Sequence, residues 1–233
     1  MALLEIKDLC YSYADGDKRK VIYDNASASF ESGRFYAITG ESGSGKTTLL
    51  YIIGGLEKEY GGKVFFKGKT IEEIGLTKYR RDHISMIYQN FNLIPYLSPV
   101  ENIEVALDIT DNDNDKSKDH IIQLLADLGI DEKAATRRAS VLSGGEQQRA
   151  AIGRAVATGS EIIIADEPTG NLDAHTAEQV IDLFRDLAHN EGKCVIMVTH
   201  NERFAGIADE WLCIDQENKK IVPARAKRLF LKG

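Results

Sequence analysis

A glycine-rich run in the first quarter of the chain has the residue types and spacing of a phosphate-binding loop. Residues 40–47, Gly-Glu-Ser-Gly-Ser-Gly-Lys-Thr, match the pattern G-x-x-x-x-G-K-[ST] in full. In such a loop the backbone N–H groups and the lysine surround the phosphates of a nucleotide, and the threonine hydroxyl can ligate Mg²⁺. A glycine-rich turn that binds nothing is the alternative, and Lys46 and Thr47 in register argue against it.

Two adjacent carboxylates follow a short apolar run. Residues 162–165 are Ile-Ile-Ile-Ala, and Asp166 and Glu167 come directly after them. Since ligands gather at the carboxyl ends of parallel strands, we expect Asp166 to hold Mg²⁺, directly or through water. Glu167 points to the other side of the strand end and is suited to accept a proton from an attacking water. Acids at strand ends are often only caps, but a doublet after four apolar residues is hard to explain that way.

A second glycine-containing motif, Leu-Ser-Gly-Gly-Glu-Gln-Gln-Arg, occupies residues 142–149. Ser143 and the amides of Gly144 and Gly145 open a helix and form an anion site. The phosphate loop already supplies such a site, so this one has no obvious use within its own subunit. From background residue usage, LSGGE should occur by chance in roughly one chain in a thousand. Its presence together with the phosphate loop therefore leaves chance a poor explanation.

In this order the motifs resemble those of the ATP-binding subunit of an ABC transporter, and the resemblance covers nearly all of the chain. The spelling ADEPTGNLD, preceded by LSGGEQQR, is most similar to the branch that holds the lipoprotein-release, macrolide and antimicrobial-peptide export, and cell-division ATPases. Each of the family's landmarks has a counterpart in this chain. They are an aromatic residue (Tyr13), the phosphate loop (Gly40 to Thr48), a glutamine (Gln89), the signature (Leu142 to Gln148), an acidic pair (Asp166-Glu167), a turn (Gly170-Asn171-Leu172-Asp173) and a histidine (His200).

The resemblance implies ATP and Mg²⁺ as ligands and gives further residues their roles. Gln89 would meet Mg²⁺ and the attacking water as a sensor of the γ-phosphate, and His200 would hold the water and Glu167 in place. Without the resemblance, a glutamine or histidine at a strand end is an ordinary structural residue. The implied catalytic residues are Glu167, His200, Gln89 and Lys46, and the implied metal contacts are Thr47, Gln89 and Asp166.

For the nucleotide itself, the resemblance assigns the adenine-stacking role to Tyr13. Tyr11 lies two residues earlier on the same expected strand face, so it is an alternative, and a plain surface tyrosine is another. The implied nucleotide contacts are Tyr13, Gly40, Glu41, Ser42, Gly43, Ser44, Gly45, Lys46, Thr47, Thr48, Ser143, Gly144 and Gly145.

The family also implies partners. Two subunits would pack head to tail when ATP binds, so that the signature of one closes over the γ-phosphate held by the other and Asp173 lies at the seam. A membrane-spanning permease subunit would complete the machine, which would place this chain in the cytoplasm on the inner face of the cell membrane. The apolar run of residues 91–97, directly after Gln89, contains Pro95, and we expect part of it to form a groove for that permease.

Apolar runs between polar residues predict an α/β fold of the ABC ATPase type, with a parallel-sheet core, an antiparallel β edge and an inserted helical subdomain. Expected strands are residues 3–9, 35–39, 64–66, 85–88, 162–165, 195–199 and 211–215; expected helices begin near Gly45 and cover 121–128, 144–157 and 174–188. We expect one ATPase domain over residues 1–233, with its core at about 1–89 and 159–233 and the helical subdomain at about 90–158.

Bulk composition excludes several classes. The 233 residues suffice for one large domain, and a net charge of −7 argues against a nucleic-acid partner. No stretch approaches the ~20 apolar residues of a membrane helix. Cys10, Cys194 and Cys213 lack metal spacing and are expected to be buried free thiols. Acidic residues at 111, 113 and 115 resemble the start of a calcium loop, but lysine and isoleucine fill its later key positions, so a solvated loop is the better interpretation.

The resulting hypothesis is an ATP-hydrolysing subunit that drives a membrane partner for export or extraction of peptides, lipoproteins or hydrophobic compounds. The alternative is a regulatory ABC ATPase that acts through a membrane partner on cell-wall or division machinery. Residues 219–233 hold six basic and no acidic residues, which favours a solvated segment, with contact to a partner or anionic surface as the other possibility.

Overall fold

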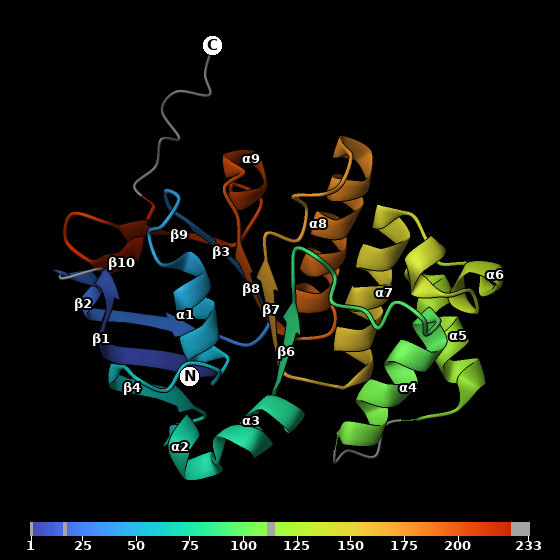
Figure 1. Ribbon diagram of the computed structural model, residues 1–233, viewed down its shortest axis with the longest axis horizontal. Coiled ribbons are helices and arrows are strands. Elements are labelled where there is room, and N and C mark those ends of the chain that lie inside the picture. The colour runs from blue at the N-terminus through green and yellow to red at the C-terminus, as the bar shows by residue number, and fades with distance from the viewer. Residues whose placement is uncertain (1, 16–17, 111–114, 225–233) are drawn as a thin grey trace.

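The computed structural model describes residues 2–15, 18–110 and 115–224. Two sheets form one half of the molecule, and a group of helices lies at the other end (Figure 1). Within the described residues, no helix has both the length and the apolar character needed to cross a membrane.

A six-stranded sheet in the order β10-β9-β3-β8-β7-β6 carries the candidate site. Its neighbours pair in parallel, except that β10 runs antiparallel to β9. The strands are β3 (Arg34–Thr39), β6 (Ile84–Ile87), β7 (Ile162–Asp166), β8 (Cys194–Val198), β9 (Glu210–Asp215) and β10 (Lys220–Pro223). Every residue of β8 is buried, as the continuous apolar run predicts for a sheet covered on both faces.

Each side of this sheet packs into a different hydrophobic core. Alternate residues such as Ile164 and Ile196 pack beneath the second sheet and α1 (Lys46–Ile53), whereas Ile163 and Val195 pack against α8 (Ala174–His189) and α9 (Glu202–Ala205). This division follows from the period of two along a strand. The expected helices at 174–188 and near Gly45 are therefore present, with α1 starting at Lys46.

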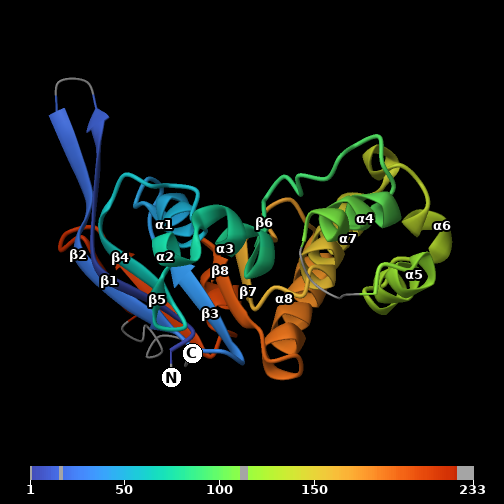
Figure 2. The same cartoon turned by 90° about the horizontal axis from the view of Figure 1, so that it is seen from below.

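The second sheet is antiparallel, in the order β2-β1-β4-β5, as the expected antiparallel edge requires. Its strands are β1 (Leu4–Asp15), β2 (Lys18–Phe30), β4 (Gly61–Phe66) and β5 (Lys69–Thr70), followed by the short helices α2 (Ile71–Ile74) and α3 (Leu76–Asp82). The β1–β2 hairpin extends beyond the body of the protein (Figure 2). The sequence patterns did not predict β2, although its residues Ile22 and Tyr23 belong to the core.

The helices at the far end enclose a third core of their own. They are α4 (Pro99–Ile109), α5 (Lys118–Asp127), α6 (Glu132–Ala135), the 3-10 helix η1 (Ala139–Val141) and α7 (Gly144–Ala157). A Cβ added to Gly153 of α7 would lie 3.1 Å from Leu128 and 3.2 Å from Leu125. Glycine thus lets α5 and the turn after it approach α7, which gives a physical reason for a residue that costs helix stability.

The expectation of three buried thiols is wrong for two of the cysteines. All three cysteines are free, but only Cys194 is buried; Cys10 and Cys213 are half-buried, because each lines an open cavity at the surface. Burial raises the pKa of Cys194 to about 12. The calcium-like residues 111–114 and most of the basic segment, 225–233, lie outside the described residues, so those interpretations stay predictions.

Candidate active site

The phosphate loop lies between β3 and α1, at the carboxyl end of the sheet. The Lys46 ammonium donates to the carbonyl oxygens of Gly40 at 2.8 Å and Glu41 at 2.9 Å, so the lysine closes the loop on itself. Gly45 caps α1 in the left-handed region, with φ 101°. A Cβ there would overlap the side chain of Ile22, so both conformation and space require glycine.

The loop fits a phosphate chain on two further observations. Ser44 Oγ is buried and has no hydrogen-bond partner among the described residues. Gly43 has φ +73°, and a Cβ added to it would meet nothing within 4 Å, so its backbone faces open space. The N-terminus of α1 adds backbone N–H groups and the positive end of a helix dipole. An anion that accepts these donors would satisfy the buried hydroxyl as well.

Thr47 and Asp166 form an oxygen-rich corner beside the loop. The Thr47 hydroxyl donates to Asp166 Oδ2 at 3.2 Å, which joins the first turn of α1 to the end of β7. Burial raises the pKa of Asp166, and the hydrogen bond from Thr47 opposes that shift. A hydroxyl and a carboxylate are ligands that Mg²⁺ prefers, and a bound cation would remove the cost of burying the charged carboxylate.

Glu167 follows Asp166 at the end of β7 and has an unusual backbone conformation. Its φ of 47° lies in the left-handed region, and its N–H donates to Val198 O of β8 at 2.9 Å. The carboxylate contacts His200 Nδ1 at 2.9 Å. The structure therefore joins two residues that lie far apart in the sequence, each directly after or close to the end of a core strand.

Gln89 lies in the loop after β6, which ends at Ile87 and not at Tyr88 as the sequence predicted. Asn171 Nδ2 donates to the Gln89 carbonyl at 3.0 Å, and a Cβ on Gly170 would approach Gln89 Nε2 at 3.0 Å. Gln89 is thus packed against the turn of residues 170–173. That turn ends at Asp173, whose carboxylate caps α8 through the N–H groups of His175 and Thr176.

The structure separates the two candidate tyrosines. Tyr11 and Tyr13 were expected on one strand face; the β1–β2 register shifts between Tyr11 and Ser12 with the extra residue, Ile22, on β2, and the two tyrosines line different cavities. The Tyr11 hydroxyl donates to Glu57 at 3.2 Å, whereas Tyr13 lines the cavity above the phosphate loop. Lys20 of β2 lies over the Tyr13 ring, 5.8 Å from its centroid.

One cavity of about 310 Å³ gathers most of the predicted residues. Gln89 and His200 are not among its lining residues, and neither are Ser143, Gly144 and Gly145. The lining residues are Tyr13, Ile22, Ser42, Gly43, Gly45, Lys46, Thr47, Thr48, Asp166 and Glu167.

The signature begins α7 in the helical part. Ser143 caps this helix: its Oγ accepts from Glu146 N at 3.3 Å, and the Glu146 carboxylate accepts from Ser143 N at 2.7 Å. The start of α7 lies close to the start of α8, because a Cβ on Gly145 would lie 2.8 Å from Thr176. The signature is thus held by a capping box and packed beside α8, and its residues do not line the phosphate cavity of their own chain.

Comparison with known proteins decides the family. The ABC transporter family matches residues 23–170. The ATP-binding protein YclH of Bacillus subtilis is 41% identical over 209 residues, covering 90% of this chain and 92% of its own. The chain belongs to the ABC transporter family. It is an ATP-binding subunit of that family and an ATPase.

Other relatives of this ABC ATPase include an export protein and a solved cassette. The macrolide export ATP-binding/permease protein MacB of Mannheimia succiniciproducens is 39% identical over 212 residues; the match spans 90% of this chain and 33% of MacB. The dimeric structure of the MJ0796 cassette, a protein of Methanocaldococcus jannaschii, superposes with a TM-score of 0.84 at 33% identity, over 94% of this chain and 96% of that one. These matches confirm the expected ABC ATPase fold.

Sequence reasoning missed several residues that shape the ABC ATPase site. Ile22 and Tyr23 come from β2; the Tyr23 hydroxyl donates to Gly45 O at 2.8 Å and so supports the phosphate loop. Thr176 joins Asp173 through a 2.6 Å hydrogen bond and faces Gly145. No local pattern marks these residues, because their role depends on segments that meet only after folding.

Proposed function

We propose that this ATPase works in a head-to-tail dimer, in which the signature of each copy closes over the phosphates bound by the other. The observation that carries the proposal is the separation of Ser143 from the phosphate cavity of its own chain. The start of α7 forms an anion site. The anion that we assign to it is the phosphate chain bound at Lys46 of the other copy. The MJ0796 cassette, which shares this fold, forms a dimer in its solved structure, and that assembly supports the proposal.

Each composite site then has the groups for hydrolysis. Glu167 accepts a proton from water as the water oxygen bonds to the γ-phosphorus and the bond to the bridging oxygen of ADP breaks. His200 fixes the orientation of the Glu167 carboxylate through their 2.9 Å contact. Bound Mg²⁺ would supply positive charge against the phosphates. Thr47, Asp166 and Gln89 are the residues assigned to hold it, and Gln89 also senses the γ-phosphate.

The membrane partner is a permease subunit, and the transport direction is export or extraction of peptides, lipoproteins or hydrophobic compounds. Support comes from the MacB relatives, whose name joins an ATP-binding part to a permease and specifies macrolide export. The chain would lie on the inner face of the cell membrane. The separate apolar core of the helical part supports a subdomain at about 90–158 inserted in an ATPase core of about 1–89 and 159–233.

Mixed dimers test the head-to-tail arrangement. Lys46→Ala damages the phosphate loop of one copy, and Ser143→Arg blocks the signature of the other. A mixed dimer has one composite site with both lesions and one with neither, so mixing the two inactive variants should restore part of the ATPase rate. Each variant alone, at the same total concentration, is the control. Turnover in the mixture that never exceeds that of either variant contradicts assembly in trans.

A further inference from the structure

Two consecutive residues after Gln89 have a backbone conformation that non-glycine residues rarely adopt. Phe91 has φ 61° and Asn92 has φ 49°, both in the left-handed region. Asparagine tolerates this region, whereas a bulky aromatic residue there is an outlier. Such a conformation costs free energy and persists only where the surrounding structure holds it. Contacts from outside the loop between β6 and α4 must therefore hold it.

Arg154 of α7 makes such contacts. Between β6 and α4 the chain passes beside α7 (Figure 1), and there Arg154 Nη1 donates to Asn92 O at 2.6 Å and Nη2 donates to Phe91 O at 3.2 Å. A planar guanidinium holds two neighbouring carbonyls at once, which the point charge of a lysine does not match. Burial lowers the pKa of Arg154, and the two carbonyls offset the cost of burying its charge.

The same loop also touches the signature end of α7. A Cβ added to Gly144 would lie 3.9 Å from Phe91 Cζ, so the tip of the Phe91 ring packs beside the first residue of this helix. Arg154 lies in the last turn of the same helix. Because one continuous helix makes both contacts, the loop is attached to the helix that carries the signature. At its other end the loop begins at Gln89.

We propose that Arg154 is a positioning residue for Gln89. It acts through the backbone of Phe91 and Asn92, which can relax to negative φ once the two hydrogen bonds are lost. Phe91 lies only two residues after Gln89, so such a change displaces Gln89 and disturbs the hydrogen bond that its carbonyl accepts from Asn171. The inference rests on the proposed role of Gln89 as sensor of the γ-phosphate, and it ties that role to the helix that begins with the signature.

Arg154→Met tests this role, because methionine keeps an unbranched side chain and removes both donors. Its kcat for ATP hydrolysis should fall about ten- to a hundredfold, since misplacing a group by about 1 Å can cost that much. ATP affinity should stay within about twofold of wild type, because the phosphate loop is untouched. Amide hydrogen exchange at Phe91 and Asn92 should become faster, since their N–H groups donate to Tyr88 O and Asn90 O and a relaxed loop loses these bonds. Unchanged kcat or unchanged exchange overturns the proposal.

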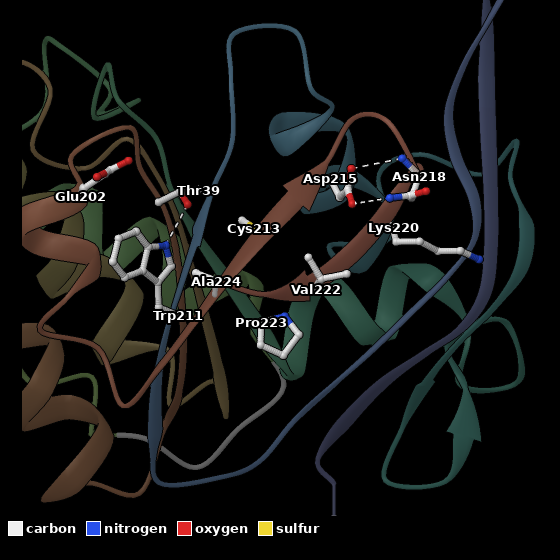
Figure 3. Close-up of a pocket in the computed structure, with 10 residues that line it drawn as sticks. All are labelled: Thr39, Glu202, Trp211, Cys213, Asp215, Asn218, Lys220, Val222, Pro223 and Ala224. Carbon is white, nitrogen blue, oxygen red and sulfur yellow. Dashed lines mark hydrogen bonds between the residues drawn. The ribbon is translucent and has the colours of Figure 1, made fainter. Parts of the chain in front are cut away.

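Lys220→Met is the matched control. Lys220 likewise donates to a backbone carbonyl, Asn25 O at 2.8 Å, but it lies on the β9–β10 hairpin, at a separate cavity of about 990 Å³ (Figure 3). This variant should keep the kcat and the loop exchange of wild type. Arg154→Lys keeps the charge without the planar pair of donors, so its kcat should lie between those of wild type and Arg154→Met. An equal loss of kcat in Lys220→Met and Arg154→Met would assign the effect to general loss of a cation and overturn the proposal.

A double-mutant cycle with Gln89→Ala shows whether Arg154 acts through Gln89. If it does, adding Arg154→Met to Gln89→Ala should lower kcat no further, because the group that Arg154 positions is already missing. Losses that multiply in the double variant mean that the two residues act independently, which overturns the proposal and leaves Gln89 as the sensor. Wild-type kcat in Gln89→Ala alone would instead contradict the sensor role in the proposed function, and with it the role of Arg154.

Discussion

The carboxylate of Glu167 receives two contacts from a single residue, His200: the ring Nδ1 at 2.9 Å and the backbone N–H at 3.3 Å. The two residues follow β7 and β8, which are adjacent parallel strands. Glu167 holds φ at 47°, a conformation that costs a non-glycine residue free energy and occurs often at functional sites. The fold thus uses backbone strain to aim one carboxylate and fixes it with one histidine.

Glu167→Gln should lower ATP turnover by about 10²- to 10⁴-fold, since an amide cannot accept the proton of the attacking water. Nucleotide affinity should stay close to wild type, because the phosphate loop is untouched. ATPase assays, equilibrium nucleotide binding and light scattering with ATP and Mg²⁺ check this, and an ATP-bound dimer should accumulate. Glu161→Gln is the matched control, because Glu161 contacts Lys67 and His83 outside the cavity. Near-normal turnover in Glu167→Gln would show that Glu167 is not the general base.

Asp166→Asn should change how stability depends on pH. Burial raises the pKa of Asp166; the Thr47 hydrogen bond and the charge of Lys46 lower it, while Glu167 raises it. A folded pKa above the unfolded value means that the contribution of Asp166 to stability is complete below the unfolded pKa and is lost as pH rises through the folded pKa. Asparagine does not titrate, so the variant should gain stability relative to wild type as pH rises through that window.

Urea unfolding without nucleotide or Mg²⁺, from acidic to neutral pH, measures this difference. Adding ATP and Mg²⁺ at neutral pH should stabilise wild type and leave the variant much less affected, since ligand binding to the folded state adds to stability. Glu161→Gln again serves as the control for loss of a carboxylate. A stability difference that does not vary with pH would show that burial of Asp166 does not govern its titration.

Tyr13→Ala should weaken ATP binding, whereas Tyr11→Ala should not. Stacking of a base on an aromatic ring is worth about 1–3 kcal/mol, roughly five- to 150-fold in the dissociation constant. Tyr13 lines the phosphate cavity, and Tyr11 is bound to Glu57 outside it. Tyr13→Phe keeps the ring and should bind like wild type. If inorganic triphosphate binding falls as much as ATP binding in Tyr13→Ala, the ring acts on the loop and not on the base.

The local patterns predicted best those elements whose whole signal lies within one segment. The helix expected at 144–157 is α7 residue for residue, because Ser143 and Glu146 form a capping box at its start. The strand before Asp166 is likewise predicted by its four consecutive apolar residues. By contrast, β2 shows no clean alternation, because irregular pairing with β1 shifts its side chains between faces.

Long-range contacts explain the remaining differences. Gly153 costs helix propensity, and its reason, the approach of Leu125 and Leu128, lies in another helix. Tyr11 and Tyr13 line different cavities, which their spacing alone does not show. The family resemblance assigned roles to Gln89 and His200 that their residue types alone do not indicate, and those roles stay predictions. In the structure, Gln89 contacts Asn171 and His200 contacts Glu167.

The last prediction concerns coupling to the permease through residues 91–97. These residues form an irregular loop after Gln89 that is held from beneath: Pro95 O accepts from Ser140 N at 3.0 Å, and Leu97 O accepts from Ala139 N at 2.8 Å. Tyr96 remains 69% exposed, the most exposed large apolar side chain among the described residues. A side chain held outward on a fixed loop is suited to contact a partner.

Tyr96→Glu should therefore leave circular dichroism and ATP affinity unchanged, yet reduce both co-purification with the permease and permease-stimulated ATPase activity. Movement at Gln89 on hydrolysis would reach the permease through this loop. A negative charge buried at the contact would weaken the packing that transmits the movement. Ile109→Glu is the matched control, because Ile109 is similarly exposed, at 64%, but lies at the end of α4. Loss of the folded state in Tyr96→Glu would show that Tyr96 stabilises the fold and does not contact the permease. Full coupling in Tyr96→Glu, or equal loss in both variants, would place the permease contact elsewhere on the surface.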